Sequence, residues 1–168
     1  LKQVAEATEE MLLAGGEERI SKQISRIMSL IRFENLEDED GVQEGGDSLE
    51  KKSMLCRASI EEINSWFGGG GSYAYHSFGF SYALFARCAL KRQLGEHVHP
   101  FEPVFWAVNG GGDTDSNAAI IGALAGALHG TKAIPLHIIS RIEGKAESTA
   151  LTEQFFKAVK NLAAREDA

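Results

Sequence analysis

The chain has 168 residues, of which 43% are apolar and 24% are charged, and its formal net charge at pH 7 is −7. This apolar content is enough for the core of one domain. The acidic balance and the scattered basic residues exclude a general nucleic-acid-binding surface, because phosphate contacts need clustered Lys and Arg. No apolar run reaches the ~18 residues that a membrane span requires. Cys56 and Cys88 fit no metal-ligand spacing, so we expect free buried thiols in a reducing, cytoplasmic compartment.

Helical spacing begins near the N-terminus. A short helix is predicted over residues 4–13, before a pair of glycines. A second helix, over 20–31, is amphipathic because its apolar residues recur at intervals of three and four. Residues 34–50 are rich in acidic residues and glycine, which predicts a solvated loop or insertion. Ser59 and Glu62 have the spacing of a capping box and predict the start of a short helix.

The helical pattern continues after the glycines 68–71, which cannot be helical at low cost. A helix is predicted over residues 73–92, and a short segment with two aromatic residues follows at 101–109. The next helix is expected over 116–129, where Gly130 ends it.

Two further helices are predicted near the C-terminus. Pro135 can begin a short helix that continues through Ile142. The last helix is expected over 149–165, with an inward face formed by Phe155, Phe156, Val159 and Leu162. No segment of useful length alternates with a period of two, so the sequence predicts an all-α protein without internal repeats.

The turn at residues 110–117 holds the strongest chemical signal. Three glycines precede Asp113 and Asp115, which stand one residue apart, and Ser116 follows. An apolar run without charge comes directly afterwards, at 118–128. Carboxylates buried beside such a helix would require compensation. A hard divalent cation bound through oxygen would supply it, and Asp and Ser are among its usual ligands.

Three other interpretations of this turn explain less. An EF-hand loop would use Asp113, Asp115 and Asn117, but it then needs Gly and Glu where Ala118 and Leu124 stand. The Asp-x-Asp of a nucleotide-sugar transferase follows a strand, and no strand pattern precedes this turn. Helix capping accounts for one carboxylate and one hydroxyl, but not for two carboxylates after three glycines.

Two glycine patterns accompany the turn. Ala118, Gly122, Gly126 and Gly130 lie four residues apart, so we expect one face of their helix to let a second helix approach closely. Residues 68–72 could bind phosphate through backbone N–H groups at the start of the following helix. A flexible linker is the alternative for this segment, since it matches neither a Walker A loop nor a dinucleotide fingerprint.

Residues 111–120, with Gly122-Ala123-Leu124, Gly126-Ala127 and Ala133-Ile134-Pro135, resemble the C-terminal signature of the ADP-ribosylglycohydrolase family. The segment 71–84 also resembles the part of that family that precedes the signature. The resemblance implies an orthogonal all-α bundle with two Mg²⁺ ions, for which Mn²⁺ can substitute in some members. It implies a hydrolase that cleaves ADP-ribose from a modified protein side chain or a related conjugate.

The same resemblance assigns site residues by position. The metal ligands would be Asp113, Asp115 and Ser116, where many members carry Thr in place of this serine. The segment near ADP-ribose would comprise Gly70, Gly71, Ser72 and Tyr73. His76 lies within the next turn and could line the same pocket as Tyr73.

Two motifs of the family are absent from the 168 residues. One is a hydroxyl residue followed by adjacent aspartates, and the other is an upstream acidic residue implicated in catalysis. We therefore expect residues 1–168 to form the C-terminal part of one domain, with the general acid or base outside it. The alternatives are a non-catalytic, crystallin-like member and one half of a split enzyme whose partner is the missing N-terminal half.

Overall fold

A computed structural model describes residues 18–31, 53–69 and 71–166. The chain divides into two compact units, Leu1–Ala133 and Ile134–Ala168, which we treat separately. The regular secondary structure in the described ranges is entirely helical, without a β-strand, which confirms the all-α prediction. The predicted helix at 4–13 and the acidic segment at 34–50 lie outside the described residues.

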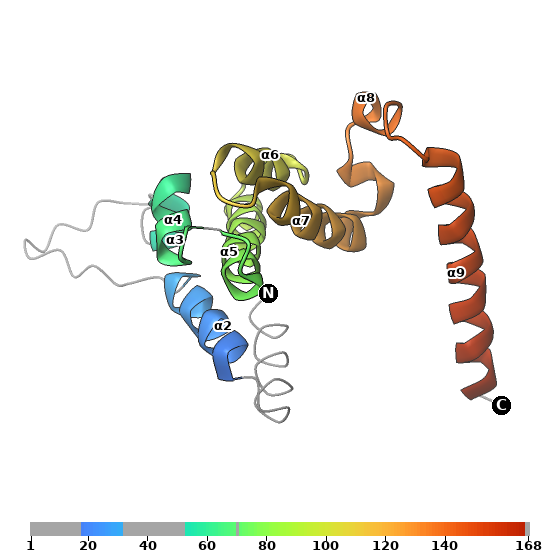
Figure 1. Ribbon diagram of the computed structural model, residues 1–168, viewed down its shortest axis with the longest axis horizontal. Coiled ribbons are helices and arrows are strands. Elements are labelled where there is room, and N and C mark those ends of the chain that lie inside the picture. The colour runs from blue at the N-terminus through green and yellow to red at the C-terminus, as the bar shows by residue number, and fades with distance from the viewer. Residues whose placement is uncertain (1–17, 32–52, 70, 167–168) are drawn as a thin grey trace, which may run out of the picture. The chain divides into compact units, whose positions relative to one another are not determined.

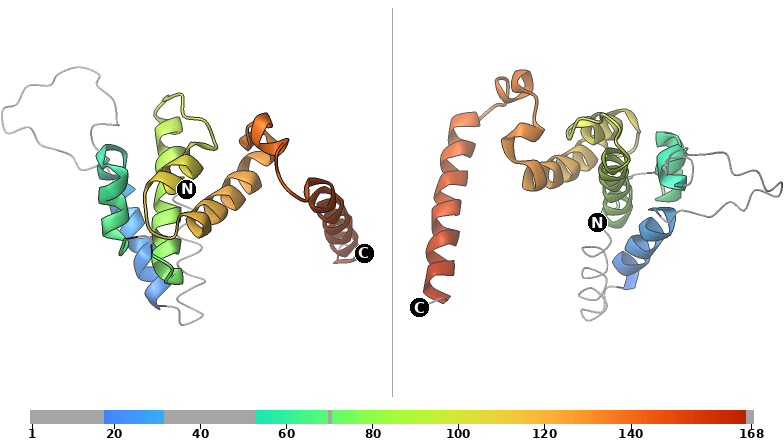
Figure 2. Two further views of the ribbon diagram at one scale, coloured as in Figure 1. Left: turned by 45° about the horizontal axis from the view of Figure 1, so that its top comes forward. Right: turned by 180° about the vertical axis from the view of Figure 1, so that it is seen from behind.

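Helix α5, Ala74–Gln93, is the centre of the first unit (Figure 1). The other views show the same central position between α2 and α7 (Figure 2). The helices that contact α5 are α2 (Glu18–Ile31), α3 (Met54–Arg57), α4 (Ile60–Trp66), α6 (Glu102–Asn109) and α7 (Thr114–His129).

The core of this unit forms around the buried side of α5. Phe80 and Leu84 of α5 are fully buried and pack in one cluster with Phe67, Ile63 and Ile121. Removal of such side chains from water contributes roughly 1.5–3 kcal/mol each. Gly79 on the same helix lets the Phe67 ring approach closely. A Cβ on Gly79 would come within 2.5 Å of the Phe67 ring.

The start of α4 shows how the sequence specifies a helix end. The Glu62 N–H donates to the Ser59 hydroxyl at 3.1 Å, and the Ser59 N–H donates to the Glu62 carboxylate at 2.7 Å. This reciprocal pair is the predicted capping box. It fixes the direction of α4, whose C-terminal residues support the two glycine-rich turns described below.

The helix boundaries differ modestly from those predicted. Helix α7 begins at Thr114, two residues before the predicted start, so Asp115 and Ser116 belong to its first turn. A 3₁₀ helix, Gly130–Ala133, follows α7 and completes the first unit.

In the second unit, α8 covers Leu136–Ile139 and α9 covers Lys145–Glu166. Within this unit nothing packs against the predicted inward face of the last helix, where Phe155 and Phe156 are 69% and 58% exposed. Val159 and Leu162 are exposed as well. The spacing identified residues that share a face, but no part of this unit covers that face.

Among the described helices, none combines the length and the apolar character that crossing a membrane requires.

The two cysteines are free and buried, as predicted. Burial raises the pKa of the Cys88 thiol to about 11, from a reference value of 9.0.

At pH 8 the folded protein should therefore hold about one hundredth of the thiolate that Cys88 has when unfolded. We expect a thiol reagent to label Cys88 at least about 100-fold more slowly in buffer than in urea. Mass spectrometry of the labelled peptide provides the measurement, and equal rates would contradict the buried position.

Candidate functional site

The turn before α7 requires its three glycines for two different reasons. Gly111 and Gly112 have positive φ values of 78° and 75°, a conformation that favours glycine. Gly110 has an ordinary φ of −82° but no room for a side chain. A Cβ there would lie 2.9 Å from both Ile60 Cγ2 and Phe80 Cζ. The glycines thus set the path of the chain that delivers Asp113 to the helix start.

Asp113 occupies the N-cap position of α7, yet its side chain makes no capping hydrogen bond. The helix-capping interpretation therefore does not hold for this carboxylate, which remains available for other chemistry. Asp113 is half-buried, whereas Asp115 and Ser116 are exposed. Burial beside the apolar helix thus does not force charge compensation, and the premise drawn from the sequence was wrong on this point.

The compensation problem arises instead from the proximity of the two carboxylates. The Asp113 side chain, within hydrogen-bonding reach, holds the pKa of the Asp115 carboxyl below its usual range, and the backbone N–H groups of Ser116 and Asp115 lower it further. Two carboxylates this close repel each other unless a proton or a cation lies between them. The N-terminal end of the α7 dipole also favours negative charge here.

Asn117, which the sequence alone did not single out as structural, anchors the acidic turn to the core. Its side chain is fully buried, and the Ser81 hydroxyl lies 3.4 Å from its Oδ1 and 3.3 Å from its backbone oxygen. The Asn117 N–H donates to the Asp113 carbonyl at 3.0 Å. Asn117 therefore holds the first turn of α7 against α5 and does not join the exposed carboxylates as an EF-hand position would require.

The oxygen atoms of the acidic turn are of the type that binds a hard divalent cation. Asp113 and Asp115 offer carboxylate oxygens that lie together, and Ser116 offers a hydroxyl in the same exposed turn. The described residues contain no cluster of three or more His, Cys, Asp or Glu residues suited to a metal. These three residues would thus supply only part of the roughly six ligands that Mg²⁺ requires.

The first two residues of the glycine-rich loop at 68–72 terminate α4. Gly68 and Gly69 adopt positive φ values, and their N–H groups donate to Ser65 O and Asn64 O at 3.4 and 2.9 Å. Those two groups are therefore not available for phosphate, which corrects the prediction that the whole loop binds it.

The remaining candidate residues of the loop lie at the start of α5. Gly70 lies outside the described residues. The Gly71 carbonyl accepts a hydrogen bond from the Ser77 hydroxyl at 2.8 Å. Ser72 and Tyr73 are exposed, and Tyr73 lines a pocket together with His76, as the sequence allowed.

Asn64 connects the two glycine-rich turns. Its side-chain amide donates to the Gly110 carbonyl at 2.7 Å, and its backbone carbonyl accepts from the Gly69 N–H at 2.9 Å. Sequence reasoning missed this residue because its partner at Gly110 lies 46 positions away along the chain. One residue at the end of α4 therefore supports both segments in which the candidate ligands stand.

The glycine face of α7 differs from its prediction. A Cβ added to Gly122 or Gly126 would meet no atom within 4 Å, so no described element packs closely there. The buried side of α7 is formed by Asn117, Ile121 and Ala125 instead. The expected close approach of a second helix to this face is thus wrong for the described residues.

The described helices and the acidic turn define an all-α protein with two neighbouring carboxyl groups at the start of a helix. The model of the ADP-ribosylglycohydrolase family matches residues 2–165. The chain therefore belongs to the ADP-ribosylglycohydrolase family, and the match is wider than the segments that carry the resemblance in the sequence. Comparisons with curated proteins and with solved structures gave no match.

Proposed function

We propose that this protein is a metal-dependent hydrolase that releases ADP-ribose from a modified protein side chain or a related conjugate. Family membership supports the hydrolase type. The observation that carries the metal dependence is the Asp113 carboxyl, which makes no capping bond and lies within hydrogen-bonding reach of Asp115. Two neighbouring carboxyl groups in a turn that solvent reaches are suited to a divalent cation.

Each residue of the turn has a defined part in this proposal. Asp113 and Asp115 hold Mg²⁺, and the Ser116 hydroxyl adds a neutral oxygen ligand. Bound Mg²⁺ would supply Lewis acidity toward the sugar or lower the pKa of a water molecule. Gly71, Ser72 and Tyr73 would contact ADP-ribose at the exposed start of α5. The general acid or base is not assigned to any residue of this chain.

Metal removal tests the proposal. The complete protein, after treatment with EDTA, should not release ADP-ribose from a panel of arginine-linked, serine-linked and acetyl-linked conjugates, and added Mg²⁺ should restore release. Mass spectrometry measures the product, and NaCl at matched ionic strength serves as the control. Release that EDTA leaves unchanged would contradict metal dependence. A protein that binds Mg²⁺ but releases ADP-ribose from no conjugate would contradict the hydrolase assignment.

A further inference from the structure

Asn64, near the end of α4, holds both segments that carry candidate ligands of the proposed active site. Its side-chain Nδ2 donates to the Gly110 carbonyl at 2.7 Å, where the glycine turn that leads to Asp113 begins. Its backbone carbonyl accepts from the Gly69 N–H at 2.9 Å, where the glycine-rich loop before α5 begins. Two segments about 40 positions apart in the chain therefore depend on the placement of one residue.

The glycine turn receives its long-range support from this side chain. In the described ranges, the backbone hydrogen bonds of residues 110–113 outside the regular helices reach at most four positions along the chain. The Asn64 amide instead comes from another helix, 46 positions away from Gly110. It also lies beside the next residue, because a Cβ on Gly111 would stand 3.7 Å from Nδ2. Gly111 and the residue after it have no side chain that could fix the turn, so we infer that the amide fixes it.

The amide of Asn64 is satisfied on one side only. Its Oδ1 atom is buried and has no hydrogen-bond partner in the structure. A buried amide oxygen without a partner costs free energy, which the bond from Nδ2 has to offset. An asparagine gains little stability from this exchange, whereas the directed bond to Gly110 fixes the position of the turn.

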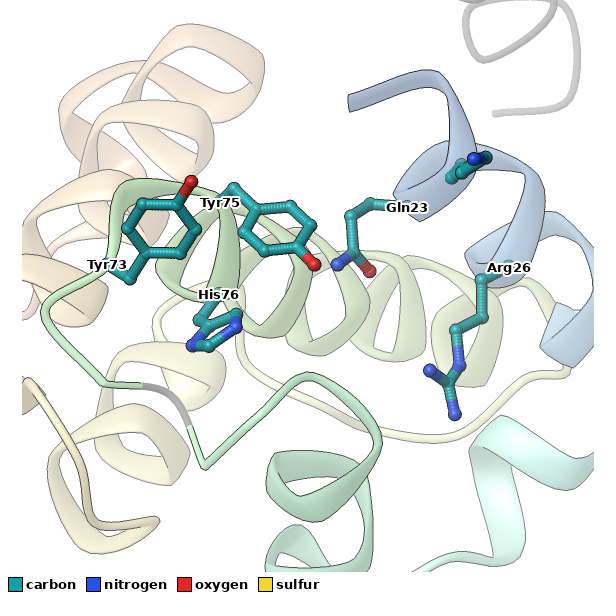
Figure 3. A pocket seen from close by; sticks show the side chains of 6 residues that line it. Gln23, Arg26, Tyr73, Tyr75 and His76 are labelled. Atoms are coloured by element: carbon teal, nitrogen blue, oxygen red, sulfur yellow. The ribbon is translucent and has the colours of Figure 1, made fainter. Parts of the chain in front are cut away.

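The loop that follows α4 is held on its other side by α5. Gly68 lies against the His76 imidazole, since a Cβ on Gly68 would come within 2.7 Å of the His76 Cε1 atom. The His76 ring stands beside those of Tyr73 and Tyr75, with ring centres 5.3 and 4.9 Å away (Figure 3). The loop and the turn thus each have a fixed support, and Asn64 is the residue that they share.

From these contacts we propose that Asn64 is a positioning residue of the proposed active site. Its amide sets the Mg²⁺ affinity of the acidic turn and makes that affinity depend on the glycine-rich loop that would contact ADP-ribose. A shift of the last turn of α4 moves the amide and the carbonyl of Asn64 together, so a change in the loop reaches Gly110 and Asp113. This inference rests on the proposed function, because it places Mg²⁺ at the acidic turn.

Asn64→Leu tests the role of the amide, because leucine is of similar size and donates no hydrogen bond. In the complete protein, calorimetry should show Mg²⁺ binding about 10–100-fold weaker than in the parent. The Mg²⁺ concentration that gives half-maximal release of ADP-ribose should rise by the same factor. The rate at saturating Mg²⁺ should approach that of the parent, since Asn64 touches no reacting group. A purely structural defect would instead lower the rate at every Mg²⁺ concentration and leave the half-maximal concentration unchanged.

Asn109 provides the matched control, because its Nδ2 also donates to a backbone carbonyl, that of Phe105 at 2.8 Å, but within its own helix. Asn109→Leu should bind Mg²⁺ as the parent does. Unchanged Mg²⁺ affinity in Asn64→Leu, whatever its melting temperature, would overturn the positioning role and leave the proposed function intact. A parent protein that binds no Mg²⁺ would overturn the proposed metal site, and the positioning role with it.

Gly69→Ala tests the link between the loop and the turn. Gly69 has a φ of 81° and no atom within 4 Å of an added Cβ, so alanine strains the backbone without a clash. The change should weaken Mg²⁺ binding about twofold or more in the parent, and leave it unchanged when Asn64→Leu is already present. Gly95→Ala is the matched control, because Gly95 has a φ of 87° and equal space but lies at the end of α5. Equal losses from Gly69→Ala with and without the Asn64 amide would overturn the link.

Discussion

In the complete protein, replacement of Asp113 with asparagine is expected to reduce release of ADP-ribose by at least about 100-fold, since even residues that only orient metal ligands account for about 10–100-fold. The substitution keeps the size of the side chain and removes its charge. It should weaken Mg²⁺ binding by a similar factor, because one of the two neighbouring carboxylates is lost. Steady-state kinetics and calorimetry with Mg²⁺ provide the two measurements.

The fold should be little affected by this change. Asp113 makes no capping hydrogen bond, so its charge stabilises α7 through the helix dipole alone, by about 0.3–1 kcal/mol. Glu61 gives a matched control because it also stands, exposed, in the first turn of a helix, α4. Glu61→Gln should retain activity and Mg²⁺ binding. Full activity of Asp113→Asn, or equal losses in both variants, would refute the role of the acidic turn.

The sequence predicted well those features that depend on neighbouring residues. Apolar spacing predicted α5 over 73–92, against Ala74–Gln93 in the structure. The capping box of Ser59 and Glu62 was also found, because its partners are three positions apart. In both cases the periodicity or the local hydrogen bond is itself the physical cause of the structure.

Features that depend on distant contacts were not predictable in this way. The Ser81 contact to Asn117 joins positions 36 apart, and neither residue stands in a motif that requires the other. Phe155 and Phe156 share a face of α9 as the spacing indicated, yet both are exposed. A helical period specifies which residues lie on one side, whereas what covers that side depends on tertiary structure.

The acidic turn lies between these two cases. Its glycines and carboxylates are adjacent in the chain, so the turn itself was recognised from the sequence. The exposure of Asp115 and the proximity of its carboxyl group to Asp113 were not recognised, because both follow from the path of the backbone. That path depends on Gly110, which has almost no space around it.

Gly110→Ala is therefore expected to lower the free energy of unfolding by about 1–3 kcal/mol, the usual cost of overpacking a core. The φ of −82° suits alanine, so the effect is steric and not conformational. The new methyl group would lie 2.9 Å from Phe80 Cζ and 3.0 Å from the Trp106 carbonyl oxygen. The backbone atom cannot move without distortion of α6.

Gly126→Ala is the matched substitution, because it adds the same methyl group within α7, where no atom lies within 4 Å. Alanine there should raise the free energy of unfolding by about 0.5–1 kcal/mol through its higher helix propensity. Urea denaturation of both variants measures the difference. Equal stabilities would show that the acidic turn is not packed tightly against the core.

Mg²⁺ affinity connects this packing to the site. Gly110 directly precedes the two left-handed glycines, and its carbonyl is held by Asn64, so a displaced Gly110 shifts the segment that carries Asp113. We expect Mg²⁺ to bind Gly110→Ala about 10–100-fold more weakly, as for loss of a residue that orients a ligand, and to bind Gly126→Ala normally. A stable Gly110→Ala protein with unchanged affinity would mean that the carboxylates are positioned independently of the glycine turn. The combined stability and affinity measurements thus test whether the packing of one glycine against Ile60, Phe80 and Trp106 determines the geometry of the carboxylate pair.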